Sequence, residues 1–390
     1  LERYLGYSNL ILTNCLEFRF FRNGERYCEP IVVGELVGDS VIDNDGRFGL
    51  LAETLSDFLK GKPEQIRSGA RLARIMGGKA RRIRDNVIRF LTDGAEKNQS
   101  LWQVYETVKK LLVHDLTTTA FADMYAQTLV YGLFVARFHD TSQESFTRQE
   151  ARDLVPASNP FLRHFFDHIV GPDFDKRLAY IVGELCDIFA NVNVKELMNE
   201  YFKKSDLWGK THQGPDPVIH FYEDFLKEYD AEQRKKLGAF YTPLPVVHFI
   251  IRAIDSILEK DFDLAQGLAD TSKIDISQIV QGKKVKESMH RVQILDPATG
   301  TGTFLNETVR AIHARFTGQT GRWMSYVDEN LLPRLYGFEL MMAPYTIAHM
   351  KLGMTLADTG YTSFNHRLGI YLTNSLEEAH NTDGTLFSLG

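Results

Sequence analysis

The residues most suited to chemistry form a glycine loop that follows a short apolar segment. Residues 292–305 read VQILDPATGTGTFL. We predict a strand that ends at Asp296, a tight loop that carries Gly300 and Gly302, and a helix that begins near Thr303. In parallel sheets, ligands bind at the carboxyl ends of the strands, and glycines there let a ligand approach the backbone closely. The pattern therefore predicts a ligand site in this loop.

Two common phosphate-binding motifs do not fit the loop. A dinucleotide-binding loop needs a third glycine where this chain has Leu305, and a P-loop needs a lysine that the segment lacks. In what remains, Asp-Pro-Ala-x-Gly-x-Gly-x-Phe, the carboxylate of Asp296 suits a ligand ammonium and no strong anion site is offered. This chemistry suits S-adenosylmethionine (SAM), which has no phosphate. A glycine turn without a ligand is the alternative.

Two later strand ends also carry polar side chains. Glu339 ends the segment LYGFE, and a carboxylate in that place can accept hydrogen bonds from both ribose hydroxyls. Asn374 follows YLT, and its amide can both donate to and accept from an adenine ring. A solvated glutamate and a plain asparagine turn are the alternatives.

A fourth segment, GAFYTP at residues 238–243, precedes the glycine loop by some fifty residues. Thr242 followed by Pro243 is a common helix start, in which the threonine caps the helix and the proline takes its first position. Capping and ligand binding are compatible interpretations here.

These four segments, in this order, resemble motifs of the SAM-dependent DNA adenine-N6 methyltransferases of the large single-chain restriction–modification type. DPATGTGTF is similar to their motif I, GAFYTP to motif X, LYGFEL to motif II and YLTNSL to motif III. The resemblance implies SAM as the cofactor, with its methionine part at the glycine loop, its ribose at Glu339 and its adenine at Asn374. The implied cofactor-binding residues are Tyr241, Thr242, Pro243, Asp296, Ala298, Gly300, Gly302, Phe304, Glu339 and Asn374.

The catalytic motif of that family, [NDS]-P-P-[FYW], has no counterpart, because the chain contains no Pro-Pro pair. In the family this motif holds the target amine and stacks on a base flipped out of the duplex. The segment Ser158-Asn159-Pro160-Phe161 lacks the second proline, and we interpret it as a helix start. The resemblance therefore implies double-stranded DNA with a flipped adenine as the partner, no catalytic residue within the chain, and a fragment that is inactive alone.

The surrounding elements predict an α/β fold in three parts. Residues 1–40, with strands at 8–21 and 30–36, resemble a β remnant of an upstream nuclease-like domain, which implies a nuclease domain in the same parent chain. Residues 41–210 are predicted to form an all-helical coupling domain. Residues 211–390 are predicted to form the N-terminal half of a Rossmann-like SAM-dependent methyltransferase domain.

Alternating elements in the last part predict a parallel sheet. The expected helices span residues 217–236, 246–258, 304–316 and 344–356. The expected strands span residues 291–295, 335–338 and 368–372. Helical spacing is also expected over 119–137 and 178–202, and a linker over 206–216.

A cluster of basic residues lies in the predicted helical region between residues 67 and 89, where Asp85 is the single acid. It either contacts DNA phosphates or forms a helix face that is solvated or docked on an acidic neighbour. Its members are Arg67, Arg71, Arg74, Lys79, Arg81, Arg82, Arg84 and Arg89. His114 and Asp115 could suggest an acid–base pair, but adjacent residues do not face each other on a helix.

Bulk properties limit the protein class. The chain has 390 residues, a net charge of −6 and three cysteines, Cys15, Cys28 and Cys186, which have no metal-site or disulfide spacing. We expect neither metal nor membrane partner, and a cytoplasmic location in a bacterium or archaeon. Two other functions stay open: an amino-methyltransferase acting on RNA or protein, and a non-catalytic, SAM-responsive coupling module.

Overall fold

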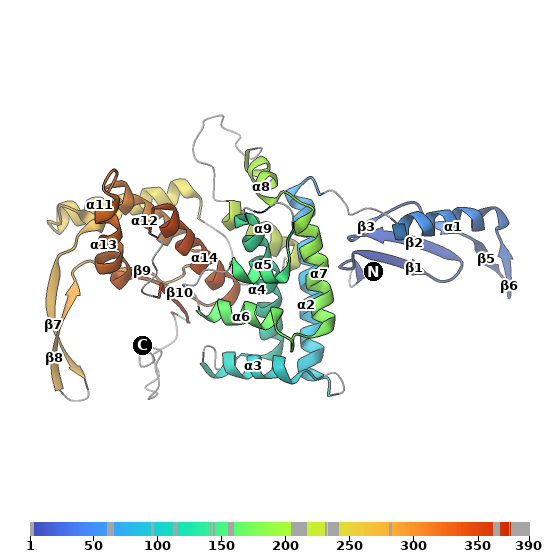
Figure 1. The fold of residues 1–390 in the computed structure, drawn as a ribbon, viewed down its shortest axis with the longest axis horizontal. Helices are drawn as coiled ribbons and strands as arrows, with labels where there is room; N and C mark the ends of the chain where they lie inside the picture. The colour runs from blue at the N-terminus through green and yellow to red at the C-terminus, as the bar shows by residue number, and fades with distance from the viewer. Residues whose placement is uncertain are drawn as a thin grey trace. The chain divides into compact units, whose positions relative to one another are not determined.

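The computed structural model is a mixture of helices and strands (Figure 1). It describes residues 4–60, 66–94, 97–111, 116–140, 142, 145–154, 160–203, 217–230, 232, 242–280, 283–361, 367–373 and 375. The chain divides into two compact units, Leu1–Pro156 with Pro160–Tyr241, and Ala157–Asn159 with Thr242–Gly390. The domain boundaries expected at residues 40 and 210 stay predictions, and the expected linker at 206–216 lies outside the described residues. No described helix is long and apolar enough to span a membrane.

The first unit begins with a small antiparallel sheet. Strand β2 (Glu17–Arg22) pairs with β1 (Asn9–Thr13), β3 (Glu25–Arg26) and β4 (Ile31–Val32). A turn at Asn23 and Gly24 joins β2 to β3, and both residues have the positive φ that such a turn requires, +47° and +83°. A separate hairpin, β5 (Gly34–Val37) and β6 (Ser40–Asp43), precedes helix α1 (Asp45–Lys60). The core under α1 consists of Phe20, Ile31, Val33 and Phe58.

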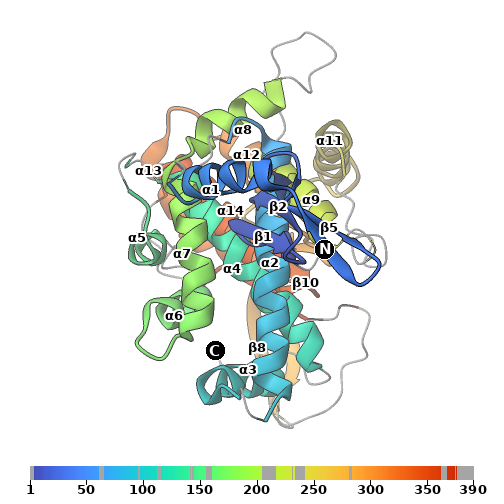
Figure 2. The ribbon, with the colours of Figure 1, turned by 90° about the vertical axis from the view of Figure 1, so that its right-hand side faces the viewer.

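Helices make up the rest of the first unit, and α2 packs against both α4 and α7 (Figure 2). They are α2 (Gly69–Thr92), α3 (Gln99–Leu111), α4 (Thr118–His139), α5 (Arg148–Asp153), α6 (Pro160–Val170), α7 (Lys176–Ala190), α8 (Val194–Lys203) and α9 (Pro217–Tyr229). The helix expected over 119–137 is confirmed by α4. The helical run expected over 178–202 is divided at Asn191, whose side chain bonds back to the Asp187 carbonyl (Nδ2–O 2.7 Å).

The end of α9 corrects a predicted boundary. The helix expected over 217–236 ends at Tyr229. The guanidinium of Arg81, from α2, donates to the carbonyls of Glu228 and Tyr229 there. The terminal carbonyls of a helix need such donors. The contact with Arg81, which lies far away in the sequence, therefore coincides with the end of α9, which the local sequence pattern did not predict.

The basic cluster on α2 is largely docked on the protein itself. Nζ of Lys79 and Nη1 of Arg82 each lie 2.8 Å from the Glu184 carboxylate on α7. Arg71 donates to the carbonyl of Asn23 at 3.1 Å. Together with Arg81, these residues favour the docked interpretation of the cluster over a DNA-binding one.

The second unit contains the predicted parallel sheet, in the order β11-β10-β9. Strands β9 (Ile294–Asp296), β10 (Leu335–Glu339) and β11 (Gly369–Leu372) and helices α11 (Leu244–Asp261), α12 (Thr303–Ala314) and α14 (Met342–Asp358) confirm the expected alternation. The observed first and last residues of these strands and helices differ from the expected ones by up to three positions. The unit also contains η2 (Gly267–Ala269), α13 (Thr320–Tyr326), η3, a π-helix (Val327–Leu331), and η4 (Leu332–Arg334).

An antiparallel hairpin in this unit was not predicted. Strands β7 (Lys273–Val280) and β8 (Lys283–His290) pair with each other between α11 and β9 in the sequence. Beside it, buried Arg334 donates to the carbonyls of Leu268 and Asn330, both at 2.6 Å. These bonds fix the backbone just before β10 and so help to position the strand that ends at Glu339.

Candidate cofactor site

The candidate site lies where β9 and β10 end side by side. These strands are parallel, with Gly337 opposite Asp296, so that Glu339 extends two residues further in the same direction. The loop after Asp296 leads into α12, as the sequence predicts. Gly300 and Gly302 adopt φ of +57° and +86°, a region that strongly favours glycine. The two acids and the glycine loop are therefore brought together at one edge of the sheet.

The loop is held against β10 by a set of short contacts. The amide of Thr299 donates to the carbonyl of Phe338 at 2.9 Å, and its hydroxyl donates to the carbonyl of Asp296 at 3.0 Å. A β-carbon at Gly337 would lie only 2.5 Å from the Thr299 hydroxyl, so only glycine leaves room for this arrangement. The loop geometry thus depends on a glycine in the neighbouring strand.

Glu339 holds the loop directly, a role that the motif alone did not reveal. One carboxylate oxygen accepts from the amide of Gly300 at 2.7 Å and the other from the amide of Met341 at 2.7 Å. Burial raises the pKa of this carboxyl, and the hydrogen bonds from Met341 and Gly300 oppose that rise. Because each carboxylate oxygen can accept more than one hydrogen bond, ribose hydroxyls can still be added, and ribose binding at Glu339 stays a prediction.

Asp296 has one satisfied and one unsatisfied oxygen. Oδ1 accepts from the amide of Ala298 at 3.2 Å, whereas buried Oδ2 has no hydrogen-bond partner among the described residues. Burial raises the pKa of this carboxyl above its usual range. The hydroxyl oxygens of Thr301 and Thr303 in the same loop are also buried and unpartnered within the described part of the chain. Buried polar atoms without partners are rare in proteins and call for a specific explanation; a bound ligand would supply one.

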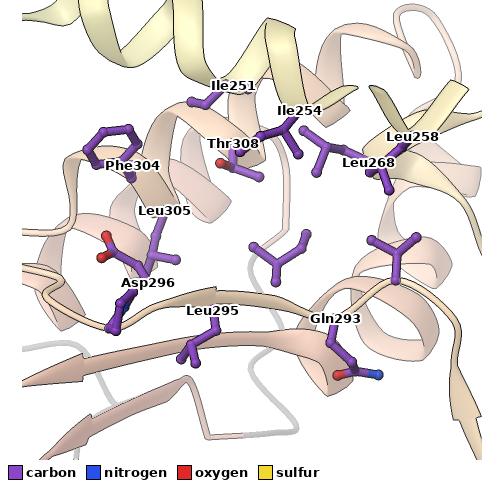
Figure 3. A pocket seen from close by; sticks show the side chains of 13 residues that line it. Ile251, Ile254, Leu258, Leu268, Gln293, Leu295, Asp296, Phe304, Leu305 and Thr308 are labelled. Atoms are coloured by element: carbon purple, nitrogen blue, oxygen red, sulfur yellow. The ribbon is translucent and has the colours of Figure 1, made fainter. Parts of the chain in front are cut away.

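A pocket of about 370 Å³ opens beside Asp296 (Figure 3). Its walls come from α11, from the β9 segment and from the first turns of α12, and they are mostly apolar. Asp296 is the sole charged side chain among the residues that line it. The lining includes Ile251, Ile254, Leu258, Leu295, Phe304 and Thr308. The pocket can therefore hold an apolar group close to one carboxylate.

The other predicted site residues lie in different places. Ala298 is exposed in the loop, and Phe304 lies half-buried at the pocket. Pro243, not Thr242, is the cap residue of α11, and no side chain caps this helix, so the predicted threonine cap is wrong. The helix begins at Leu244, one residue later than a Thr242 cap requires. Tyr241 and Asn374 lie outside the described residues.

Other candidate groups add no second site. Pro160 is the first residue of α6, as the helix-start interpretation of this segment expects. His114, Asp115, Ser158 and Asn159 lie outside the described residues. Among the described residues, no group of three or more His, Cys, Asp or Glu side chains is arranged to hold a metal ion.

Comparison with known proteins gives a curated relative and several solved structures. A provisionally named type II restriction enzyme and methyltransferase of Methanocaldococcus jannaschii is 22% identical over 293 residues, which make up 70% of this chain and 24% of that protein. Among solved structures, the DrdV–DNA complex matches 95% of this chain and 30% of its own, with 22% identity and a TM-score of 0.46. LlaBIII, an ATP-dependent Type ISP restriction–modification enzyme bound to DNA, matches 85% of this chain and 20% of its own, with 17% identity and a TM-score of 0.49.

The family model described as N-6 DNA Methylase matches residues 213–387. This range includes the glycine loop, Asp296 and Glu339. The chain spans about a quarter of the length of the curated relative that it matches. Residues 213–387 of this chain are therefore similar to the N-6 DNA methylases.

Proposed function

We propose that this chain is part of a SAM-dependent methyltransferase that modifies N6 of adenine in DNA within a restriction–modification system. The observation that carries the proposal is Oδ2 of Asp296, which is buried with no hydrogen-bond partner among the described residues and lies beside a glycine loop that Glu339 holds in place. The match of residues 213–387 to the N-6 DNA methylases supports it. The name of the curated relative, which joins restriction and methylation, supports the restriction–modification context.

The groups at the site fit SAM. Its ammonium would neutralise the Asp296 carboxylate, and its ribose hydroxyls would donate to Glu339, whose oxygens have spare acceptor capacity. The apolar pocket walls suit the uncharged parts of the cofactor. The positive φ at Gly300 and Gly302 keeps the loop free of side chains on the side where the ligand must approach.

The chain's own residues bind and orient the cofactor. Bound SAM supplies an electrophilic methyl group on its sulfonium sulfur. Glu339 fixes the loop through the Gly300 amide before any ligand arrives, which lowers the ordering cost of binding. The groups that would accept hydrogen bonds from the target amine belong to the family's [NDS]-P-P-[FYW] motif, which this sequence lacks. The proposal therefore assigns cofactor binding, and no proton transfer, to the chain.

Calorimetric titration with SAM, SAM's demethylated product, ATP and NAD tests the binding step. We expect saturable binding of SAM and the product, and at least tenfold weaker binding of the two phosphate-bearing nucleotides, because the loop offers them no cationic partner. Binding of ATP or NAD as tight as that of SAM would contradict the proposal.

The transfer step needs a second assay. Nucleoside analysis of DNA from cells that express the full gene product should reveal N6-methyladenine. SAM binding without any methylated DNA would favour the SAM-responsive coupling module. Methyl label in RNA or protein instead of DNA would favour the other class of amino-methyltransferase.

A further inference from the structure

The β7–β8 hairpin, residues 273–290, forms an isolated two-stranded ribbon. Its strands pair over eight residue pairs, from Lys273 opposite His290 to Val280 opposite Lys283, and pair with no other described strand. The ribbon runs away from α11 and α13 of the same unit (Figure 1). At about 3.4 Å per residue it is about 27 Å long. Isolated hairpins are marginally stable in water, so a ribbon of this length calls for a reason.

The base of the ribbon is fixed to the unit. The amide of Arg291 donates to the carbonyl of Ser272 at 2.9 Å, and its guanidinium donates to the carbonyl of Phe262 at 3.2 Å. Buried His290 lies within hydrogen-bonding distance of Asn330, with Nε2 and Oδ1 3.2 Å apart. Anything that the ribbon contacts is thereby placed in a defined position relative to the methylase fold of this unit.

The outer half of the ribbon is basic. Between residues 276 and 286 the sequence has three lysines, Lys283, Lys284 and Lys286, and no acid, although the chain as a whole carries a net charge of −6. Positions 284 and 286 share one face as alternate residues of β8, with register partners 279 and 277. Lys273 at the base belongs to the same face, and both Lys273 and Lys286 are exposed. Asp275 is the one acid on this face.

We propose that this face of the ribbon, through Lys273 and Lys286, binds the phosphate backbone of double-stranded DNA. The inference rests on the proposed function, because it names the surface that holds the substrate duplex. Lysine contacts to phosphate position a protein on DNA without reading its sequence, and the major groove is wide enough to admit a two-stranded ribbon. A local positive region on an acidic chain also attracts a polyanion specifically to that region.

Two other properties of the ribbon favour alternative roles for it. Lysines on an exposed strand edge also prevent pairing with other strands. The opposite face carries Ile274, Ile276 and Met289, and Ile274 is 46% exposed, so a protein surface could cover that face. An experiment must therefore separate loss of a DNA contact from both alternatives.

Fluorescence anisotropy with a labelled duplex, measured over a range of salt concentrations, provides the test. The test variant is the double substitution Lys273→Glu and Lys286→Glu, which keeps both strands charged and so keeps their protection against edge pairing. The matched control is Lys176→Glu with Lys195→Glu, two exposed lysines of α7 and α8 that make the same change in net charge. We expect the ribbon variant to bind at least tenfold more weakly than the unaltered chain, and its salt dependence to fall by about two phosphate contacts. The control should lose no more than about threefold.

Several results would overturn the inference. They are equal weakening in the ribbon and control variants, an unchanged salt dependence, or no duplex binding by the unaltered chain at low salt. A loss on Ile274→Ser as large as that on the lysine variant would assign the contact to the other face. Calorimetry with SAM on the same proteins separates this inference from the proposed function. DNA binding that depends on the ribbon without SAM binding would refute only the cofactor proposal, whereas SAM binding with ribbon-independent DNA binding would refute only the ribbon.

Discussion

Helix α2 and the glycine loop both bury polar groups, but they treat them in opposite ways. On α2, Lys79 is 1% exposed, and its ammonium is bonded to Glu184 and to the Ser8 hydroxyl. In the glycine loop, Oδ2 of Asp296 is buried with no partner among the described residues. Buried polar groups that are fully paired fix a structure, whereas unpaired ones mark a place where something else binds. The contrast assigns α2 to architecture and the loop to ligand binding.

The largest expected effect on stability comes from removing Glu184, the carboxylate that pairs with Lys79 of α2. Although burial raises the pKa of the Glu184 carboxyl, the charge of Lys79 leaves it below its usual value. Glu184→Ala would leave Lys79 buried without its carboxylate and should cost about 3–5 kcal/mol of unfolding free energy. Urea unfolding followed by circular dichroism measures this loss. Glu106→Ala, at an exposed position of α3, is the control; if Glu184→Ala costs no more than Glu106→Ala, the pairing on α2 is not structural.

A smaller loss is expected when the loop is displaced from its strand. In Gly337→Ala, the new methyl group would meet the Thr299 hydroxyl at 2.5 Å. We expect a loss of about 1–3 kcal/mol in stability and weaker SAM binding, since the loop must shift. Gly321→Ala on α13 has nothing within 4 Å of the new carbon and should be neutral or slightly stabilising. Equal SAM affinity in both variants would show that the loop position does not matter.

The raised pKa of Asp296 gives a pH dependence with opposite signs for binding and folding. Ionised Asp296 is required to pair with an ammonium, so SAM affinity should fall on acidification, beginning above the pH at which an ordinary carboxyl would respond. The folded, SAM-free chain takes up this proton more readily than the unfolded chain, so the Asp296 contribution to stability rises as the pH falls. Calorimetry from pH 7 to pH 5 measures the first effect. A SAM affinity that stays constant from pH 7 to pH 5 would show that Asp296 does not contact the ligand.

The smallest effect is expected at a hydroxyl that has no partner. Thr301 is completely buried and its hydroxyl is unpartnered within the described part of the chain. Thr301→Val should change the unfolding free energy by less than about 1 kcal/mol, because no hydrogen bond is lost. Thermal unfolding of the ligand-free chain measures this change. A loss above about 2 kcal/mol would reveal a structural role and would weaken the contrast with α2.

The sequence predicted the elements around the glycine loop well, because local signals define them. Gly300 and Gly302 mark the loop, and the apolar runs beside it give β9, β10 and α12 close to their observed bounds. The β7–β8 hairpin was not predicted, although Ile274 and Ile276 alternate with polar residues, a pattern typical of a strand.

Contacts between distant residues could not be predicted in the same way. The end of α9 coincides with the contacts from Arg81, which lies far away in the sequence. The contact of Glu339 with Gly300 requires knowing that β9 and β10 are neighbours. The sequence motifs identified both residues but not the hydrogen bond between them. The basic cluster on α2 likewise allowed two interpretations until its partners, such as Glu184, were placed.

The most direct test of the central claim is Asp296→Asn, measured for both stability and SAM binding. If Asp296 exists to hold a ligand, removing its charge should leave the ligand-free chain as stable as before or more so, while SAM affinity falls at least tenfold, or about 1.4 kcal/mol. Asp261→Asn, an exposed acid at the end of α11, should change neither quantity. A variant that loses stability and keeps its SAM affinity would show that Asp296 is a structural residue and that the glycine loop is not the cofactor site.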